Sequence, residues 1–488
     1  MTTTVRLDGA STRIADIHAV AREGAVIEPS QDVTPGLQRA RAILERAASG
    51  GQQIYGMNTG LGANLRTEVA DDDHDFQHRL VMGRGMAVGP ALPVAETRAV
   101  IAARLSMLSA GGSGMSPETF AALVAMLNAG VHPELPSIGS IGAGDLVQMS
   151  AMAQCLIGEG RAEFQGEWLP AAEALARSGL KPVVLRPKDG ISLLNASAVS
   201  VGLGALALND VQALMSRQRE AAALCFEALG GNPLILSPAI QAARPAPHQA
   251  SEAAHVLAAL EGSSLFDAKV ALQDPLSLRC IAPIHGALAD ALEHAIAIVE
   301  IELNAAADNP LVIVEQDHVL STGNFHTPAL SLAFEALGLA VAQAAAASAA
   351  RFIQLTGTGR NGLPRYLSPA GGASAGFVPM QKTVSALMAR IRQMANPVML
   401  DFLPVSEGVE DHATQSTLTV EKLRNMLVFW RRLVACELLA AAQAVELRTA
   451  HHCGVGTSRT LGMVRDSAPA MAEDRPMGAD VDRLAAAI

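Results

Sequence analysis

The stretch that decides the fold is "ASAVSVGLGALALNDVQALMSRQREAAALCFEALGGNP", residues 196–233 of the 488-residue chain. It contains few helix-breaking residues before its last four, Gly230-Gly231-Asn232-Pro233, which end a helix. A helix of this length is well above the average for globular proteins. The sequence therefore predicts one long helix here.

Three further runs have the same character, and they are residues 284–307, 327–355 and 414–448. Their alanine-rich faces allow close approach of neighbouring helices, which is typical of a long bundle. Part of this apolar surface is expected to face other subunits. We expect a mainly α protein, with residues 191–488 forming the long-helix bundle region that completes the site and the oligomer core.

In residues 1–190 the helical pattern is interrupted more often by loops. We expect this region to carry the general base and the loop that departs from the family, both described below. Shorter helices are predicted within 34–49 and 116–131, separated by Gly- and Pro-bearing loops. Strand-like alternation is weak, and "EFQGEWLPA" (163–171) indicates at most one small hairpin.

Composition excludes several classes of protein. A net charge of -11 argues against a nucleic-acid surface, which needs clustered Lys and Arg. The N-terminus has no secretory pattern, and the apolar run 336–355 is rich in Ala, so we expect a buried bundle helix there and no membrane partner.

Five scattered cysteines without a CxxC pair argue against disulfides and structural zinc, so a cytoplasmic protein with reduced thiols is expected. His451-His452-Cys453 stands alone in the sequence, and no metal site is predicted there.

The loop "IYGMNTGLGAN" (54–64) places Tyr55 ahead of Gly56, Gly60 and Gly62. Such glycines let backbone approach a ligand closely. A tyrosine there can act as a general base only if nearby positive charge or hydrogen bonds lower its pKa. The alternative is a tyrosine that only packs.

Further motifs combine Asn, Gln, Arg and acidic residues in loops between the expected helices. They are "DGISLLNASAVS" with Asn195, "QDPLSLRC" with Gln273 and Arg279, "LNAAADNP" followed by "STGNFHT" with Asn324, and "GVEDHATQS" with Glu410 and His412. Together and in this order, from about residue 55 to residue 412, they resemble the histidine/phenylalanine/tyrosine ammonia-lyase family.

The resemblance implies a helical homotetramer whose active sites are shared between subunits. It implies that Tyr55 removes a proton from Cβ of the substrate. It implies that Arg279 pairs with the substrate carboxylate, a task suited to the planar guanidinium. Asn195, Gln273 and Asn324 would line the same pocket, and Glu410 would lie beside the amine or ring of the substrate.

One loop departs from the family. The family pattern is G-S-(V/I)-G-A-S-G-D-L, in which Ala-Ser-Gly cyclises into an electrophilic methylidene-imidazolone. This chain has "GSIGAGDL" (139–146), where Gly142, Ala143 and Gly144 replace the triad and the serine is missing. Ser140 precedes Ile141 and cannot substitute. We therefore expect no prosthetic group and no other cofactor.

Other departures concern the substrate pocket. Leu276 stands where the family has a tyrosine, and Gly83-Arg84 occupies the pair that reads the substrate ring. Lys382 replaces an uncharged residue. A lysine in a pocket is costly unless paired, and Glu410 is the expected partner. The alternative is a lysine on a helix surface.

Without an electrophile, elimination requires a nitrogen that already leaves easily. Through its shortened loop and its Lys382 and Glu410, the sequence resembles the ergothionase branch of the family. This resemblance implies a carbon-nitrogen lyase that releases trimethylamine from ergothioneine, the betaine of 2-thiohistidine, to give thiourocanate. Tyr55, Lys382 and Glu410 are then the expected catalytic residues, with Arg84 assisting at the ring. Two alternatives stay open, namely a histidine or aromatic amino acid ammonia-lyase and a non-catalytic ligand-binding relative.

Overall fold

The computed structural model describes residues 3–70, 73, 75–268, 271–357, 362–400, 402–448 and 451–488. The chain forms two compact units, each built from three separate segments. The first unit comprises residues 1–209, 295–332 and 397–421, and the second comprises 210–294, 333–396 and 422–488. These units are defined by compactness, and they do not test the expected division at residue 190.

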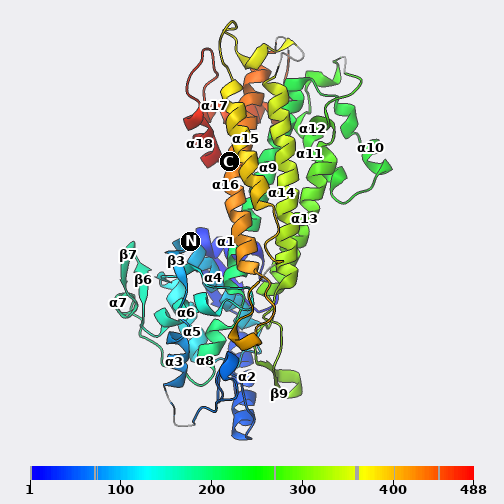
Figure 1. Ribbon diagram of the computed structural model, residues 1–488. Coiled ribbons are helices and arrows are strands. Elements are labelled where there is room, and N and C mark those ends of the chain that lie inside the picture. Colours follow the sequence, from blue (N-terminus) through cyan, green and yellow to red (C-terminus); the bar gives the residue numbers. More distant parts are fainter. Residues whose placement is uncertain are drawn as a thin grey trace. The chain divides into compact units, whose positions relative to one another are not determined.

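The four long helices expected from the sequence are confirmed (Figure 1). They are α9 (Ala198–Leu229), α13 (Ile281–Leu303), α14 (Pro328–Leu355) and α16 (Ser416–Glu446). The division between the two units falls inside each of them. The mainly α class is therefore correct.

The remaining helices are shorter. Those of the first unit are α1 (Ile14–Arg22), α2 (Val33–Ser49), α3 (Phe76–Met82), α4 (Val94–Ser109), α5 (Pro117–Asn128), α6 (Leu146–Leu156), α7 (Ala171–Arg177) and α8 (Asp189–Leu194). Those of the second are α10 (Pro238–Ala243), α11 (Gln249–Ala259), α12 (Leu276–Arg279), α15 (Val378–Met394), α17 (Val455–Ser467) and α18 (Gly478–Ala487).

The expected hairpin forms, but further short strands were not predicted. The strands are β1 (Thr4–Leu7), β2 (Val26–Pro29), β3 (Val88–Ala91), β4 (Val131–Pro133), β5 (Pro136–Ile138), β6 (Arg161–Phe164), β7 (Glu167–Pro170), β8 (Leu311–Ile313) and β9 (His318–Leu320). β6 and β7 pair in antiparallel register, and β4 extends them to three strands. Segments of three or four residues are too short for alternation to reveal them.

A small apolar core in the first unit supports the loop that carries Tyr55. Ile54 is buried together with residues of α2, β8 and β9, and the other members are Ala40, Ile43, Leu44, Val312 and Val319. Burial of a side chain such as Ile54 contributes about 1.5–3 kcal/mol. The residue before Tyr55 is therefore anchored.

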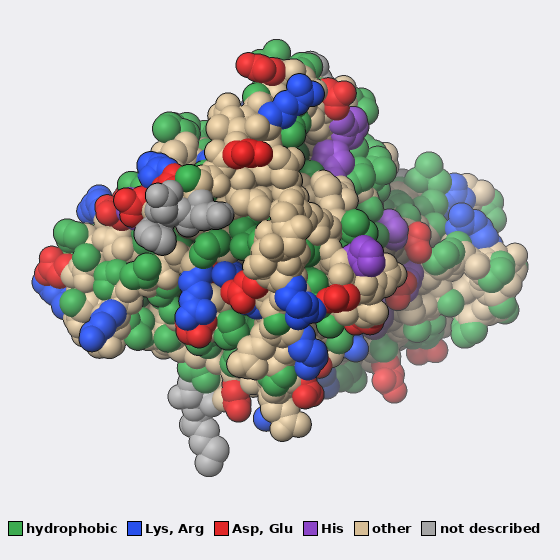
Figure 2. All heavy atoms as spheres, turned by 90° about the horizontal axis from the view of Figure 1, so that it is seen from below, with side chains coloured by type: hydrophobic (Ala, Val, Ile, Leu, Met, Phe, Trp, Pro, Cys, Tyr) green, Lys and Arg blue, Asp and Glu red, His purple; other side chains and the backbone are tan. Residues whose placement is uncertain are grey.

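Two apolar stretches pass the test for a membrane span by length and composition. They are 189–229, whose most apolar window is wholly buried, and α14, whose window is 56% buried. Core helices of soluble proteins pass the same test. On the face shown in Figure 2, acidic and basic side chains of the described residues are intermingled and not gathered by sign.

We predict that Gly202 in α9 is required for close packing on α4. A Cβ at Gly202 would lie 2.7 Å from the Ala99 carbonyl oxygen and 2.9 Å from Val100 Cα. Overpacking of this kind costs about 1–3 kcal/mol, so Gly202→Ala should lower the melting temperature measured by calorimetry. A Cβ at Gly462 in α17 would meet nothing within 4 Å, so Gly462→Ala should leave the melting temperature unchanged or raise it. Equal effects of the two variants would contradict this packing argument.

Candidate functional site

The Tyr55 loop is held by contacts within the loop and by Gln77. Gly56 has a positive φ of 72°, and a Cβ there would lie 2.9 Å from Leu61 Cδ2. Gln77 Nε2 donates to the Gly56 carbonyl at 3.0 Å. The Gly62 N–H donates to the Tyr55 hydroxyl at 2.8 Å. Glycine is therefore required at position 56. The hydrogen bond from Gly62 fixes the Tyr55 side chain against the second half of the same loop.

Burial and the groups around Tyr55 shift its pKa in opposite directions. Burial raises its pKa above 10.0, and Glu410 adds to the increase, whereas the Gly62 N–H and Arg84 lower it. The net pKa is raised because burial is the largest effect. The hydrogen bond and the cation required for a basic tyrosine are both present, but they do not outweigh burial. Burial also lowers the pKa of Arg84.

Glu410 ends a tight turn in the same unit. Val405 and Glu410 form a backbone bridge, and the Ser406 hydroxyl donates to the Glu410 carboxylate. A Cβ at Gly62 would lie 3.8 Å from Ser406 Oγ, so the turn lies against the Tyr55 loop. The structure thus brings Tyr55, Arg84 and Glu410 together, as the charge effects on Tyr55 also indicate.

The loop that departs from the family is anchored at both ends. Ser140 Oγ donates to Asp145 Oδ1 at 2.6 Å, and the Gly142 N–H donates to Ser140 Oγ at 2.9 Å. Thr414 Oγ1 donates to the Gly142 carbonyl at 2.7 Å. Ser140 therefore has a structural task.

The residues of this loop do not fit the prosthetic group that the family resemblance implies. Ala143 is followed directly by Gly144, so no hydroxymethyl group is available to become the methylidene carbon. Gly144 has a φ of 76°, and a Cβ there would lie 3.1 Å from Asn195 Oδ1. A Cβ at Gly142 would lie 2.2 Å from Thr414 Oγ1. Larger side chains are excluded at both glycines.

The two asparagines differ in burial. Asn195 ends α8, is buried, and donates from Nδ2 to the Asn309 carbonyl at 3.0 Å. Asn324 is exposed, and its backbone N–H donates to Thr322 Oγ1. Both belong to the first unit, as do Tyr55 and Glu410.

Three expected site residues belong to the second unit. Lys382 is exposed on α15, Gln273 is exposed ahead of α12, and Arg279 is half-buried at the end of α12. The pairing of Lys382 with Glu410 and the roles of Gln273 and Arg279 stay predictions.

Several further polar residues lie around the site, and they are Ser406, Thr414 and the pair formed by His326 and His412. His412 was named in its motif without a partner, and the other three were not predicted. All four lie inside or beside motifs that the sequence singles out, "NFHT" and "EDHAT". Their position within or beside these motifs was the available signal, but their hydrogen-bond partners depend on contacts between distant parts of the chain.

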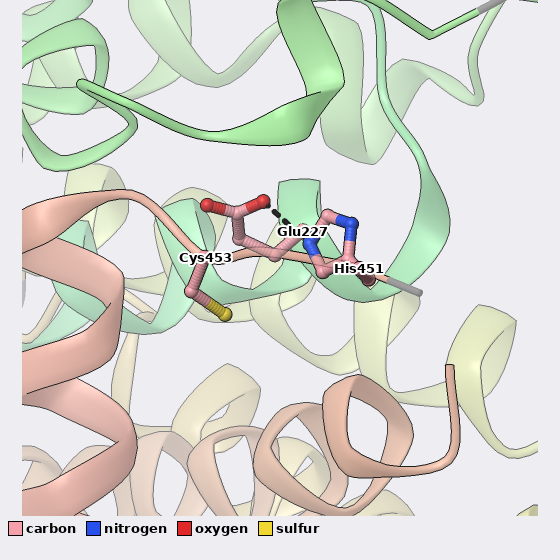
Figure 3. A group of neighbouring side chains, drawn as sticks. All are labelled: Glu227, His451 and Cys453. Carbon is pink, nitrogen blue, oxygen red and sulfur yellow. Dashed lines mark hydrogen bonds and ion pairs between the residues drawn. The ribbon is translucent and has the colours of Figure 1, made fainter. Parts of the chain in front are cut away.

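A separate cluster in the second unit brings Glu227 of α9 beside His451 and Cys453 (Figure 3). The Glu227 carboxylate accepts four hydrogen bonds, and its donors are the Ser263 hydroxyl, His451 Nε2, the Gly454 N–H and the Thr457 hydroxyl. Burial raises the pKa of Cys453 to about 11, so its thiol stays protonated. Through these four hydrogen bonds the Glu227 carboxylate connects α9 to residue 263 and to the segment 451–457, which is a structural role.

The chain is similar over nearly its whole length to known proteins. The family described as "Aromatic amino acid lyase" matches residues 12–466. The histidine ammonia-lyase of Stigmatella aurantiaca is 36% identical over 489 residues, covering 99% of this chain and 96% of that protein. The ergothionase of Treponema denticola, an ergothioneine-degrading enzyme solved with desmethyl-ergothioneine sulfonic acid, superposes with a TM-score of 0.95 at 30% identity, covering 99% and 98% of the two chains. The histidine ammonia-lyase of Trypanosoma cruzi gives a TM-score of 0.92 at 29% identity, covering 99% and 93%.

We predict that Tyr55 ionises above pH 10 in the free protein and that Arg84 lowers this pKa. The chain has two tyrosines, so the ultraviolet titration of the wild type minus that of Tyr55→Phe isolates Tyr55. In an Arg84→Met background the midpoint should move higher, because a cation that favours the phenolate is lost. Circular dichroism at each pH checks the fold. A midpoint below 10, or no movement in Arg84→Met, would refute this account.

Proposed function

Because this chain belongs to the aromatic amino acid lyase family, we propose that it eliminates trimethylamine from ergothioneine to give thiourocanate, without a methylidene-imidazolone electrophile. The observation that carries the proposal is the loop Gly142-Ala143-Gly144, which lacks the serine while Tyr55 and Glu410 are retained. The likeness to an ergothioneine-degrading structure over 99% of the chain supports it.

The substrate class follows from the chemistry of the leaving nitrogen. In an ordinary amino acid the ammonium protons are more acidic than the Cβ proton, so a base removes the wrong proton and leaves a poor leaving group. A quaternary ammonium has no N–H to lose. Its fixed positive charge acidifies Cβ, and it departs as neutral trimethylamine.

In the reaction we propose, the Tyr55 phenolate takes the proton from Cβ. The electrons of that C–H bond form the Cα=Cβ double bond, and the pair of the Cα–N bond leaves with trimethylamine. The proton on Tyr55 then returns to solvent. Each bond that breaks is matched by one that forms, so the step requires no further reactant.

The raised pKa of Tyr55 in the free protein means that the phenolate is disfavoured until further positive charge is placed beside it. Burial disfavours the phenolate, while Arg84 and the Gly62 N–H favour it. A trimethylammonium group beside this site adds a second fixed positive charge, which shifts the balance toward the phenolate. The ammonium group of an ordinary amino acid is also positively charged, but a base can neutralise it by removing an N–H proton.

The remaining residues hold the substrate in this proposal. Arg279 and Asn195 bind the carboxylate, since a guanidinium and an amide both donate hydrogen bonds to it. Lys382 and Glu410 bind the thioimidazole ring, with the lysine nearer the sulfur. Gln273, Asn324 and Arg84 complete the pocket. The trimethylammonium lies against Gly142–Gly144.

The alternative is a histidine ammonia-lyase, which the 36% identity to the Stigmatella aurantiaca enzyme favours. That reading requires an electrophile from another source, visible as near-ultraviolet absorbance and an intact mass reduced by two waters. A non-catalytic relative would bind ergothioneine without releasing trimethylamine.

We also propose a cytoplasmic homotetramer with shared active sites. The part of α14 that belongs to the second unit supports an oligomer. Its exposed residues recur every three or four positions, so they lie on one face of the helix, and only one of them is polar. They are Ala336, Leu339, Gln343, Ala346, Ala350 and Ile353. Small and apolar residues repeated every three or four positions are typical of helix pairing.

We predict that the protein releases trimethylamine and thiourocanate from ergothioneine and leaves histidine unchanged. Tyr55→Phe should lower kcat by at least about 100-fold, because general-base catalysis contributes roughly 10²–10⁴-fold. Tyr366→Phe, which changes the other tyrosine, is the matched control and should keep wild-type turnover. Thiourocanate absorbance and trimethylamine release are the measurements. Rapid deamination of histidine would replace this proposal with the alternative above.

We predict that Leu339→Glu breaks the oligomer. Leu339 is 50% exposed on α14, and a carboxylate there would be desolvated between subunits. Ile240→Glu on α10 is the control, because Ile240 is also 50% exposed in the same unit. Mass photometry should give a smaller species for Leu339→Glu and the wild-type mass for Ile240→Glu. An unchanged mass for Leu339→Glu would remove α14 from the interface.

A further inference from the structure

Two histidines of the first unit meet beside the site, and the proposed reaction does not use them. His326 Nε2 and His412 Nδ1 lie 2.8 Å apart, and the ring centroids are 5.0 Å apart at 67°. A hydrogen bond between two imidazoles needs an N–H on one ring and a lone pair on the other. The pair therefore links residue 326 to residue 412 through a single shared proton.

Both histidines border the shortened loop. Ala143 and His326 form an antiparallel backbone bridge. On the other side, the Gln415 N–H donates to the Ile141 carbonyl at 2.9 Å, next to the bond between Thr414 and Gly142. The loop 141–143 thus contacts both the segment that contains His326 and the segment that contains His412. The histidine pair joins those two segments directly.

Glu410 lies close to this link in the chain. It lies two residues before His412, and within its turn it is bound to Val405 and Ser406. Ser406 and Glu407 have left-handed φ values of 56° and 57°, which are unfavourable for residues other than glycine. Residues in such unfavourable conformations need support from the surrounding structure. His412 supplies the first side-chain tie that follows Glu410.

We propose that His326 and His412 are a positioning pair that sets the place of Glu410 relative to the Gly142–Gly144 loop. The inference rests on the proposed function, in which Glu410 holds the substrate ring and the loop faces the leaving group. The pair acts through Glu410 and the loop, and neither imidazole is required to contact the substrate. Misplacement by about 1 Å can cost an enzyme about 100-fold in rate.

The two contacts use different ring nitrogens, and this permits a crossed set of amide variants. An asparagine side chain places its amide near the position of Nδ1, and a glutamine reaches the position of Nε2. For His412, whose Nδ1 makes the bond, Asn should restore function and Gln should not. For His326, whose Nε2 makes the bond, Gln should restore function and Asn should not. Leucine variants at both positions remove the bond.

We expect His326→Leu and His412→Leu each to lower kcat/KM for ergothioneine by about 10- to 100-fold. His326→Gln and His412→Asn should recover most of this loss. The double leucine variant should be no worse than either single variant, because both remove one shared bond. His255→Leu, at an exposed histidine of the second unit, is the control for substitution of a surface imidazole. Additive losses in the double variant, or equal loss in Asn and Gln at one position, would overturn the proposal.

Hydrogen exchange separates failure of this inference from failure of the proposed function. Peptides covering 141–145 and 405–412 should exchange faster in the leucine variants than in His326→Gln and His412→Asn, and this requires no substrate. If the exchange pattern holds while the wild type leaves ergothioneine intact, the positioning pair stands and the reaction proposed above is wrong. If ergothioneine is turned over while exchange and kcat/KM are unaffected by the leucine variants, the pair has no positioning role.

Discussion

The site depends on one buried carboxylate, that of Asp145 at the start of α6. Its oxygens accept hydrogen bonds from Ser140 Oγ at 2.6 Å, the Ser200 N–H at 3.0 Å and Thr417 Oγ1 at 3.2 Å. Burial raises the pKa of Asp145, and these hydrogen bonds oppose the increase. A buried acid without such donors is costly. The shortened loop and the first turns of α9 and α16 must therefore meet at this residue.

The long helices could be predicted because their signal is local. An uninterrupted alanine- and leucine-rich run between glycine and proline breakers indicates a helix whatever surrounds it, and the bounds of α9 and α14 agree with the prediction within a few residues. The strands β1, β2, β8 and β9 could not be predicted, because three or four residues carry no periodicity. Pairing across 22 residues decides β1 and β2, and β8 and β9 pair through a short local hairpin.

The same distinction applies to the site. Tyr55, Arg84 and Glu410 could be identified from their motifs, and the structure brings them together. The net effect on the pKa of Tyr55 could not be predicted, because it is a difference between burial and neighbouring charges that requires coordinates. The partner of Thr414 could not be predicted either, because Thr414 and Gly142 are more than 200 residues apart in the sequence. Ser140 bonds to Asp145 within its own loop. Sequence identifies the participants, whereas the balance between them depends on packing.

The crowding at Gly142 also bears on how this loop could change during evolution. Its backbone is left-handed, and Thr414 and Ser416 occupy the space that a side chain would need. Gaining one serine codon between Ala143 and Gly144 would lengthen a segment that is already tied at Gly142 and Asp145. The longer loop would fit only after compensating changes in the chain around residue 414. A lineage carrying this arrangement would thus need several simultaneous substitutions before its loop could reach the length of the family pattern.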